Sequence, residues 1–116
     1  RIVIVGGGAT ACELAQSLAR LLNVGGACHV DLVAPTLLRG EDVTLANAAA
    51  QLLRQEGIHL YLRATVQEIL MDRRIRLSNQ QILPPCDAII FCTGRSPGPS
   101  LAGLQLSKAN VEWDPT

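Results

Sequence analysis

The feature that most constrains this fold is an abrupt change of hydrophobic period at the run Gly6-Gly7-Gly8. Residues 2–5, just before it, are a short, apolar and β-branched run, as in a strand buried on both faces. From Ala9 to about Asn23 the period is helical, with the stripe Ala11, Leu14, Ala15, Leu18, Leu21 and Leu22. Residues 30–33 then predict a second strand. The order of these elements predicts a βαβ unit with a right-handed crossover.

The next part of the chain repeats the alternation of helix and strand. Asp42 is placed to cap a second helix with its carboxylate, and Gly57 is placed to end that helix in the left-handed conformation. The apolar face of this helix is expected to contain Leu45, Ala46, Ala49, Leu52 and Leu53. Residues 58–62 predict a third parallel strand.

The pattern changes after residue 62. Short alternating segments separated by polar turns predict a small antiparallel meander over residues 65–70, 74–77 and 81–83. Residues 87–91 are again wholly apolar and predict a last buried strand. These elements together predict an α/β fold, with a Rossmann-like parallel sheet, βαβ units and a small antiparallel β-meander crossover, arranged as a three-layer ββα sandwich.

Length and composition fit one domain. The chain has 116 residues, of which 48% are hydrophobic and 17% charged, with ten basic residues against ten acidic ones. This balance gives no electrostatic footprint for nucleic acid, and no apolar run approaches the roughly 20 residues that cross a membrane. Because strand-like sequence begins at residue 1 without an initiator Met, we expect residues 1–116 to be a single domain taken from a larger protein.

The cysteines give no sign of a metal site or a redox pair. Cys12, Cys28, Cys86 and Cys92 form no Cys-x-x-Cys pair, and with the two histidines they complete no zinc spacing. On one extended strand, Cys86 and Cys92 would lie about 20 Å apart, too far for a disulfide. Free thiols are typical of a reducing compartment, so a cytoplasmic location is expected.

The glycine turn has the pattern G-x-G-x-x-A over Gly6-Gly7-Gly8-Ala9-Thr10-Ala11. Gly6 permits a sharp turn, Gly8 lets a pyrophosphate approach the helix N-terminus, and Ala11 lets helix and strand pack closely. A strand before this pattern and an amphipathic helix after it favour dinucleotide binding. A purely structural turn, or another nucleotide-like ligand such as S-adenosylmethionine, is an open alternative at this point.

The end of the second strand bears on the choice between NADH and NADPH. A carboxylate there would hold the ribose 2′-hydroxyl of NADH, but this chain has Ala34 followed by Pro35. Arg39, a few residues later, could form charge-assisted hydrogen bonds to a 2′-phosphate. The alternative for Arg39 is an ordinary surface arginine. The absent carboxylate and Arg39 together lean towards NADPH.

These residues resemble the flavoprotein pyridine nucleotide-disulfide oxidoreductases. The stretch from Ile4 to Ala15 is similar to the NAD(P)-binding turn of that family and the acid that follows it. Asp87-Ala88-Ile89-Ile90-Phe91-Cys92-Thr93-Gly94-Arg95-Ser96-Pro97 is similar to the family's strand and A-T-G-R-x-P element, with Cys92 in place of alanine. The resemblance covers nearly the whole chain.

The resemblance implies roles for single residues. Those expected to line the dinucleotide at the turn are Gly6, Gly7, Gly8, Ala9, Thr10 and Ala11. Glu13 would orient the nicotinamide carboxamide near the flavin, although a glutamate at this place also complements the helix dipole. Thr93 and Gly94 would lie in the loop beside the cofactor, and Arg95 would tether the domain to its neighbour.

Besides Cys92, two positions depart from the family's pattern. Ala9 stands where many relatives place an aromatic residue over the flavin, so that gate would be missing. Gly98 replaces a common asparagine, which changes the turn after the motif.

The resemblance implies that the chain is the NAD(P)H-binding domain of an FAD-dependent oxidoreductase, which positions nicotinamide for hydride transfer to the flavin. It implies no catalytic residue in the chain itself, which alone should bind NAD(P)H without binding FAD or turning over. The expected partners are the FAD-binding and dimerisation domains of the parent chain, in a homodimer. Two other interpretations stay open: a stand-alone redox-sensing regulatory module, and a degenerate domain kept for assembly.

Overall fold

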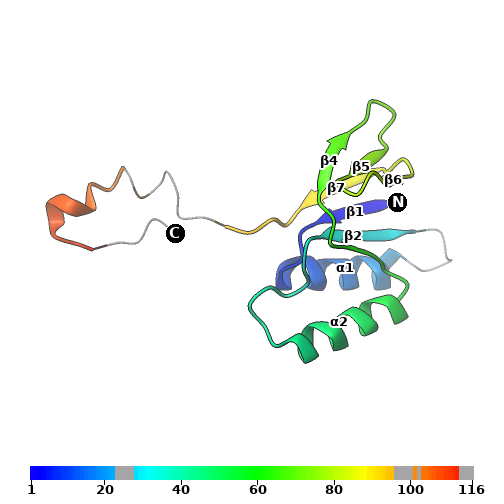
Figure 1. Cartoon of the computed structure of the whole chain (residues 1–116), viewed down its shortest axis with the longest axis horizontal. Helices are drawn as coiled ribbons and strands as arrows, with labels where there is room; N and C mark the ends of the chain where they lie inside the picture. Colours follow the sequence, from blue (N-terminus) through cyan, green and yellow to red (C-terminus); the bar gives the residue numbers. More distant parts are fainter. Residues whose placement is uncertain (23–27, 96–100, 102, 113–116) are drawn as a thin grey trace.

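The computed structural model describes residues 1–22, 28–95, 101 and 103–112. Within these residues the helices are α1 (Ala9–Leu22), α2 (Val43–Gln55) and a 3-10 helix, η1 (Leu106–Ala109), which lies apart from the layered body (Figure 1). The strands are β1 (Ile2–Val5), β2 (Val30–Ala34), β3 (His59–Leu62), β4 (Val66–Ile69), β5 (Ile75–Leu77), β6 (Ile82–Leu83) and β7 (Ala88–Phe91). The expected helix end at Asn23 and the motif residues Ser96, Pro97 and Gly98 lie outside the described residues.

Four strands form a parallel sheet in the order β3-β2-β1-β7 (Figure 1). β1 pairs with β2 from Ile2 opposite Val30, and with β7 from Ile2 opposite Ala88. β2 pairs with β3 from Asp31 opposite His59. The prediction of a Rossmann-like parallel sheet is confirmed. Because all four strands run in the same direction, their carboxyl ends meet at one edge of the sheet.

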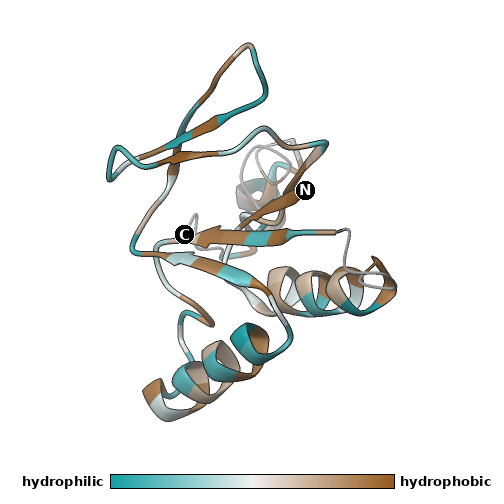
Figure 2. Cartoon of the chain, turned by 90° about the vertical axis from the view of Figure 1, so that its right-hand side faces the viewer, coloured by the Kyte–Doolittle hydropathy of each residue, from teal (hydrophilic) through white to brown (hydrophobic). Residues whose placement is uncertain are grey.

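The strands β4, β5 and β6 form a separate antiparallel sheet in that order. β4 pairs with β5 around a bulge between Val66 and Glu68, and β5 pairs with β6 from Ile75 opposite Leu83. Figure 1 shows this meander on one face of the parallel sheet and the two α-helices on the other. The predicted three layers are therefore present, and Figure 2 shows the apolar strands of the parallel sheet between them.

Each face of the parallel sheet has its own core. The core under the helices contains Ile4, Ala11, Ala15, Ala19, Val30, Leu32, Ala34, Leu37, Ala50, Leu53 and Ile58. The core under the meander contains Val3, Val5, Val33, Ala64, Ile75, Leu77, Leu83 and Cys86. Alternate residues of β1 and β2 point into opposite cores, which explains why these strands are apolar at almost every position.

The second helix begins and ends as predicted. The side chain of Asp42 accepts a 2.7 Å hydrogen bond from the amide of Thr44. Hydrogen bonding to the Thr44 side chain, and then to its amide, holds the pKa of Asp42 below its usual value. Gly57 follows the helix with a φ of 82°, in the left-handed region that glycine adopts without strain. In the described parts of the chain, no helix combines the length and the apolar content needed to cross a membrane.

Small side chains bring the helices onto the sheet. The buried residues of the two helices are Ala11, Ala15, Ala19, Ala50 and Leu53. On the predicted apolar stripes, four larger leucines stay outside the core: Leu21, Leu22, Leu45 and Leu52 are 42–71% exposed. A helix that packs through alanine lies close to the sheet, so the longer side chains beside that contact project past it.

The amino-terminal edge of the sheet holds a buried carboxylate. Asp31 in β2 is fully buried, and its Oδ2 accepts a 2.5 Å hydrogen bond from the Arg1 guanidinium. Its Oδ1 lies 3.0 Å from Nδ1 of His59, whose ring stacks on His29 with the centroids 6.0 Å apart. Arg1 and His59 thus supply polar partners to both oxygens of the buried carboxylate. The cluster lies at the edge of the sheet opposite to the glycine turn.

Candidate functional site

The glycine turn joins β1 to α1 at the carboxyl edge of the sheet. Gly6 has a φ of 136°, and a Cβ there would overlap the carbonyl group of Cys92. The Gly6 amide donates to the carbonyl of Val33 at 2.9 Å, and the Cys92 amide donates to that of Val5 at 2.7 Å. Glycine is needed here because the backbone turns sharply while two neighbouring strand ends lie against it.

Gly7 has a structural role that the sequence pattern does not specify. A Cβ on Gly7 would overlap the carbonyl oxygen of Thr36 and would lie 2.8 Å from the Cβ of Ala34. The carbonyl of Gly7 also accepts a 2.6 Å hydrogen bond from the amide of Leu38. Gly7 therefore lets the loop after β2 lie against the turn. The only sign of this role in the sequence is that a glycine also occupies the variable position between Gly6 and Gly8.

Gly8 differs from both of its neighbours. Apart from its two chain neighbours, no atom of the described residues lies within 4 Å of the place where its Cβ would be, and its φ lies outside the left-handed region. α1 starts at the next residue, and its first turn carries no acidic side chain. The unpaired amides and the positive end of the helix dipole therefore face open space. Nothing among the described residues requires a glycine at this position.

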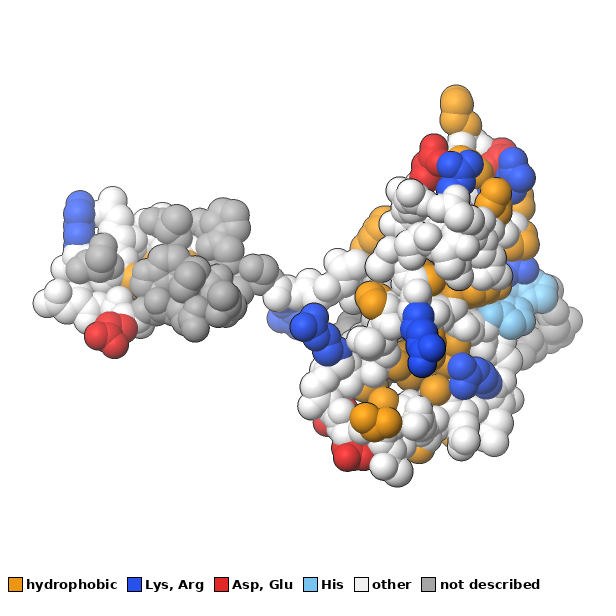
Figure 3. Space-filling view, viewed as in Figure 1, with side chains coloured by type: hydrophobic (Ala, Val, Ile, Leu, Met, Phe, Trp, Pro, Cys, Tyr) orange, Lys and Arg blue, Asp and Glu red, His pale blue; other side chains and the backbone are white. Residues whose placement is uncertain are grey.

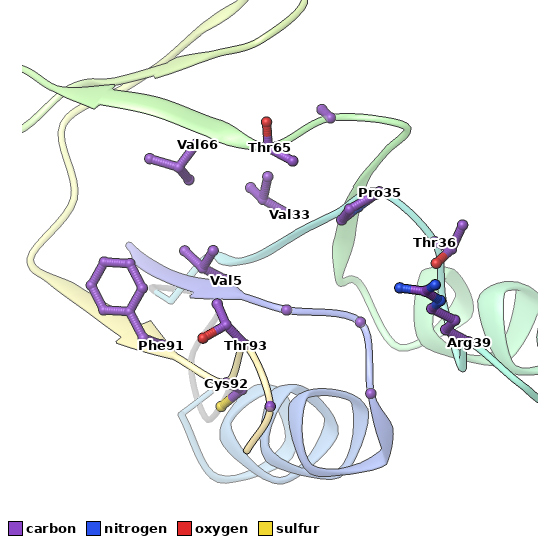
Figure 4. A pocket seen from close by; sticks show the side chains of 15 residues that line it. Val5, Val33, Pro35, Thr36, Arg39, Thr65, Val66, Phe91, Cys92 and Thr93 are labelled. Carbon is purple, nitrogen blue, oxygen red and sulfur yellow. The ribbon is translucent and has the colours of Figure 1, made fainter. Parts of the chain in front are cut away.

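A hollow of about 810 Å³ opens in front of the turn, between the parallel sheet and the start of the meander (Figure 4). Its lining consists of Val5, Gly6, Gly7, Gly8, Val33, Pro35, Thr36, Arg39, Ala64, Thr65, Val66, Phe91, Cys92, Thr93 and Gly94. Figure 4 shows Val5, Val33 and Val66 between β1 and β4, on the apolar side of the hollow. The glycine turn and Arg39 form its polar side.

The structure brings together about half of the predicted cofactor residues. Those that line the hollow are Gly6, Gly7, Gly8, Arg39, Thr93 and Gly94. Ala9, Thr10 and Glu13 are exposed on the first turns of α1, outside this lining. Ala11 and Ala34 are fully buried, so they can affect the site only through packing. These six residues come from three separate segments that meet at the carboxyl edge.

Two parts of the lining are missing from the sequence prediction. Ala64, Thr65 and Val66, at the start of the meander, form the wall opposite the glycine turn. Phe91, expected in a buried strand, is 61% exposed because β7 is an edge strand of the sheet. The register places Phe91 opposite Val5. The exposure of Phe91 follows from the strand order, which cannot be read from the local hydrophobic period of the sequence.

The loop after β2 presents Arg39 to the hollow. Leu37 anchors the loop with 7% exposure, and Leu38 and Gly40 turn the chain with φ values of 48° and 97°. Figure 4 shows the Arg39 guanidinium beside Thr36, on the side of the glycine turn. Among the described residues, no carboxylate oxygen lies within 4.0 Å of this guanidinium. Figure 3 shows several Lys or Arg side chains on the face of the layered body that is turned to the viewer.

The thiols near the turn offer no obvious nucleophile. Burial, and then the charge of Glu13, raise the pKa of the Cys12 thiol, which keeps it protonated at neutral pH. Cys92 is half-buried at the base of the hollow, and all four cysteines are free. With its apolar valines, the start of α1 and Arg39, the lining is suited to an anionic ligand that carries an apolar ring.

Comparison with known proteins identifies the family. The model of the pyridine nucleotide-disulphide oxidoreductase family matches residues 1–116. The chain belongs to this family. The resemblance seen in the glycine turn and in the Thr93-Gly94-Arg95 element is thereby confirmed.

Members of the family and solved structures resemble the chain along almost its full length. Dihydrolipoyl dehydrogenase of Bacillus subtilis (strain 168) is 27% identical over 117 residues, which cover 98% of this chain and 24% of the relative. An engineered water-forming NADPH oxidase, solved with NADPH bound, is 25% identical with a TM-score of 0.74, and the match covers 99% of this chain and 24% of the oxidase. A ferredoxin reductase from Rhodopseudomonas palustris shares the fold at 19% identity and a TM-score of 0.78, over 97% of this chain and 27% of the reductase. The chain thus spans about a quarter of the length of these proteins.

Proposed function

We propose that this chain is the NAD(P)H-binding domain of an FAD-dependent oxidoreductase and that it positions the nicotinamide for hydride transfer to the flavin. The observation that carries the proposal is the open space in front of Gly8, at the amino end of α1. The backbone needs Gly6 and Gly7 for its own packing, whereas it does not need Gly8. A glycine of this kind beside unpaired helix amides suits a bound pyrophosphate.

The place and lining of the hollow support the same proposal. It lies outside the carboxyl ends of the parallel strands, where β1 has β2 on one side and β7 on the other. Ligands of open α/β sheets usually bind at such a point. A volume of about 810 Å³ falls in the range of cofactor sites. The valine-lined side suits an apolar ring, and the glycine turn suits phosphate groups.

We infer a preference for NADPH over NADH. β2 ends in Ala34, so no carboxylate stands where it would repel a 2′-phosphate, and Arg39 lies on the rim of the hollow. The similar NADPH-bound oxidase carries five engineered substitutions, which include an aspartate replaced by alanine and two newly introduced arginines. Loss of an acid together with gain of guanidinium groups is the chemistry that Ala34 and Arg39 would supply in this chain.

The chain would contribute to the reaction by positioning the nicotinamide cofactor. When bound, NAD(P)H supplies a hydride, which the flavin accepts. The glycine turn, with the first-turn amides of Ala9 and Thr10, would hold the pyrophosphate at the amino end of α1. Gly94 would permit close approach of the nicotinamide half, and the exposed Glu13 would orient its carboxamide. Because none of these groups exchanges electrons, the isolated chain should bind NAD(P)H without turnover.

We further infer that the partners of this domain are an FAD-binding domain and a dimerisation domain of the same parent polypeptide, within a homodimer. The chain matches about a quarter of each relative, which leaves ample length in those proteins for such parts. FAD would be held by the partner domain, since the hollow described above accounts for one dinucleotide.

Calorimetric titration with NADPH and NADH, on the natural chain and on Gly8→Val and Gly8→Ala, tests the proposal. The natural chain should bind at least one nucleotide with a Kd below about 1 mM. Gly8→Val should weaken binding about tenfold or more because its side chain fills the space in front of the turn, with an unfolding midpoint close to that of Gly8→Ala. Equal affinity in Gly8→Val would contradict the site. No binding by the natural chain would contradict the function and favour a domain kept for assembly.

A further inference from the structure

Arg63 shares the carboxyl edge of the sheet with Arg39. Directly after β3, the amide of Arg63 donates to the carbonyl of Pro35 at 3.1 Å, and the amide of Ala64 donates to that of Ala34 at 3.4 Å. Paired strands lie about 4.8 Å apart. Arg63 therefore stands one strand spacing from Pro35 and next to Ala64, and both of these residues line the hollow.

The backbone of Arg63 adopts a conformation that favours glycine. Its φ is 57°, in the left-handed region, where a residue with a Cβ is destabilised relative to glycine. The turn from β3 into the meander needs this conformation but does not need a guanidinium. Residues in such conformations are often found at ligand sites. We therefore ask whether the Arg63 side chain contributes to binding in the hollow.

The charges around Arg63 point to an anionic ligand. On the helices and the meander, Arg20, Arg74 and Arg76 pair with carboxylates at 2.5 to 2.8 Å. The exposed Arg39 and Arg63 have no carboxylate oxygen within 4.0 Å among the described residues. The segments 33–40 and 58–66 that carry them contain no acidic residue. Glu41 and Asp42 follow in the turn before α2, where Asp42 caps that helix. Arg39 and Arg63 are therefore free to bind a ligand anion at this corner of the hollow.

We propose that Arg63 acts with Arg39 as a second guanidinium that binds the 2′-phosphate of NADPH, a phosphomonoester on the adenosine ribose. The inference rests on the proposed function. A phosphate beside Pro35 would lie between the loop after β2 and the end of β3, and would accept charge-assisted hydrogen bonds from both side chains. Arg63 would thus set cofactor specificity without any part in hydride transfer.

The test compares Arg63→Gln with Arg54→Gln, a matched control. Arg54 is also exposed and also has no carboxylate partner among the described residues, but it lies in the last turn of α2, away from the hollow. Calorimetry with NADPH, NADH, 2′,5′-ADP and 5′-AMP separates the 2′-phosphate from the rest of the nucleotide. Arg63→Gln should weaken NADPH and 2′,5′-ADP about tenfold and leave NADH and 5′-AMP unchanged. Arg54→Gln should leave all four unchanged.

A further variant, Arg63→Gly, separates binding from folding. It should lose the same affinity for NADPH while its unfolding midpoint equals or exceeds that of the natural chain, because glycine relieves the left-handed backbone. Unchanged NADPH affinity in Arg63→Gln, or equal losses for NADH and NADPH, would overturn the inference and leave the proposed function intact. Absence of nucleotide binding by the natural chain would overturn both.

Discussion

The carbonyl group of Thr36 occupies the space that a side chain at Gly7 would need, so the loop after β2 lies directly against the glycine turn. A 2.6 Å hydrogen bond from the amide of Leu38 to the carbonyl of Gly7 fixes this contact. The same loop carries Arg39 on the rim of the hollow. Gly7 therefore links the position of the turn to the position of the side chain expected to select the cofactor.

Substitution of Gly7 by alanine should destabilise the fold and weaken nucleotide binding together. The added methyl group has backbone on one side and Ala34 on the other, so we expect a loss of about 1–3 kcal/mol in the free energy of unfolding, measured with urea. Gly8→Ala is the control, with a change within about 0.5 kcal/mol because its Cβ meets open space. Equal stability of the two variants would contradict the packing described for Gly7.

Arg39→Ala should weaken NADPH binding and spare NADH. One charge-assisted hydrogen bond is worth about 1.5–3 kcal/mol, so the Kd for NADPH should rise about tenfold or more. Titration at low and high salt adds a check, since a contact between exposed charges weakens with ionic strength. Equal losses for both nucleotides would refute a role for Arg39 at the 2′-phosphate.

Asp31→Ala should affect stability and leave binding unchanged. The fully buried carboxylate pairs with Arg1 and His59, and its removal leaves the 18% exposed Arg1 without its partner. We expect a loss of about 2–3 kcal/mol in urea unfolding, below the value for a fully enclosed pair because His59 is half exposed. Asp72→Ala, which breaks an exposed pair with Arg74, should cost less than about 1 kcal/mol. A changed NADPH affinity in Asp31→Ala would show that the two edges of the sheet are coupled.

The ion pair between α1 and α2 should make stability depend on pH in the acid range. The Arg20 guanidinium donates to both carboxylate oxygens of Glu56, at 2.6 and 2.8 Å, and with Gln16 it holds the pKa of Glu56 below its usual value. The stabilisation is therefore present above the unfolded-state pKa of about 4.3 and is lost as the pH falls through the lower folded-state pKa. Urea unfolding between pH 7 and pH 3 should show a flatter decline for Glu56→Gln and for Arg20→Gln. Parallel profiles for these variants and the natural chain would contradict this assignment.

Local rules were enough to predict most of the elements. β1 covers residues 2–5 as expected, because a buried strand with a glycine stop is defined by its own sequence. Asp42 caps α2 and Gly57 follows its end, because capping depends on residues within one turn. The G-x-G-x-x-A pattern likewise pointed to the turn at which the hollow opens.

The features that escaped prediction depend on segments distant in the chain. Gly7 is explained by Thr36, and the buried Asp31 by Arg1 and His59. The exposure of Phe91 follows from the edge position of β7, which periodicity does not encode. The exposed leucines of the helices also depend on distant segments. The apolar stripe of a helix can be read from the sequence, but the part of that stripe covered by the sheet cannot.

The most direct test of the central claim is a map of amide chemical-shift changes on adding NADPH to the ¹⁵N-labelled chain. The account predicts that the largest changes occur at Gly6, Gly7 and Gly8 and at Arg39, with little change at Asp31 on the opposite edge of the sheet. Changes centred on the Asp31 edge, or no change at saturating NADPH, would contradict it.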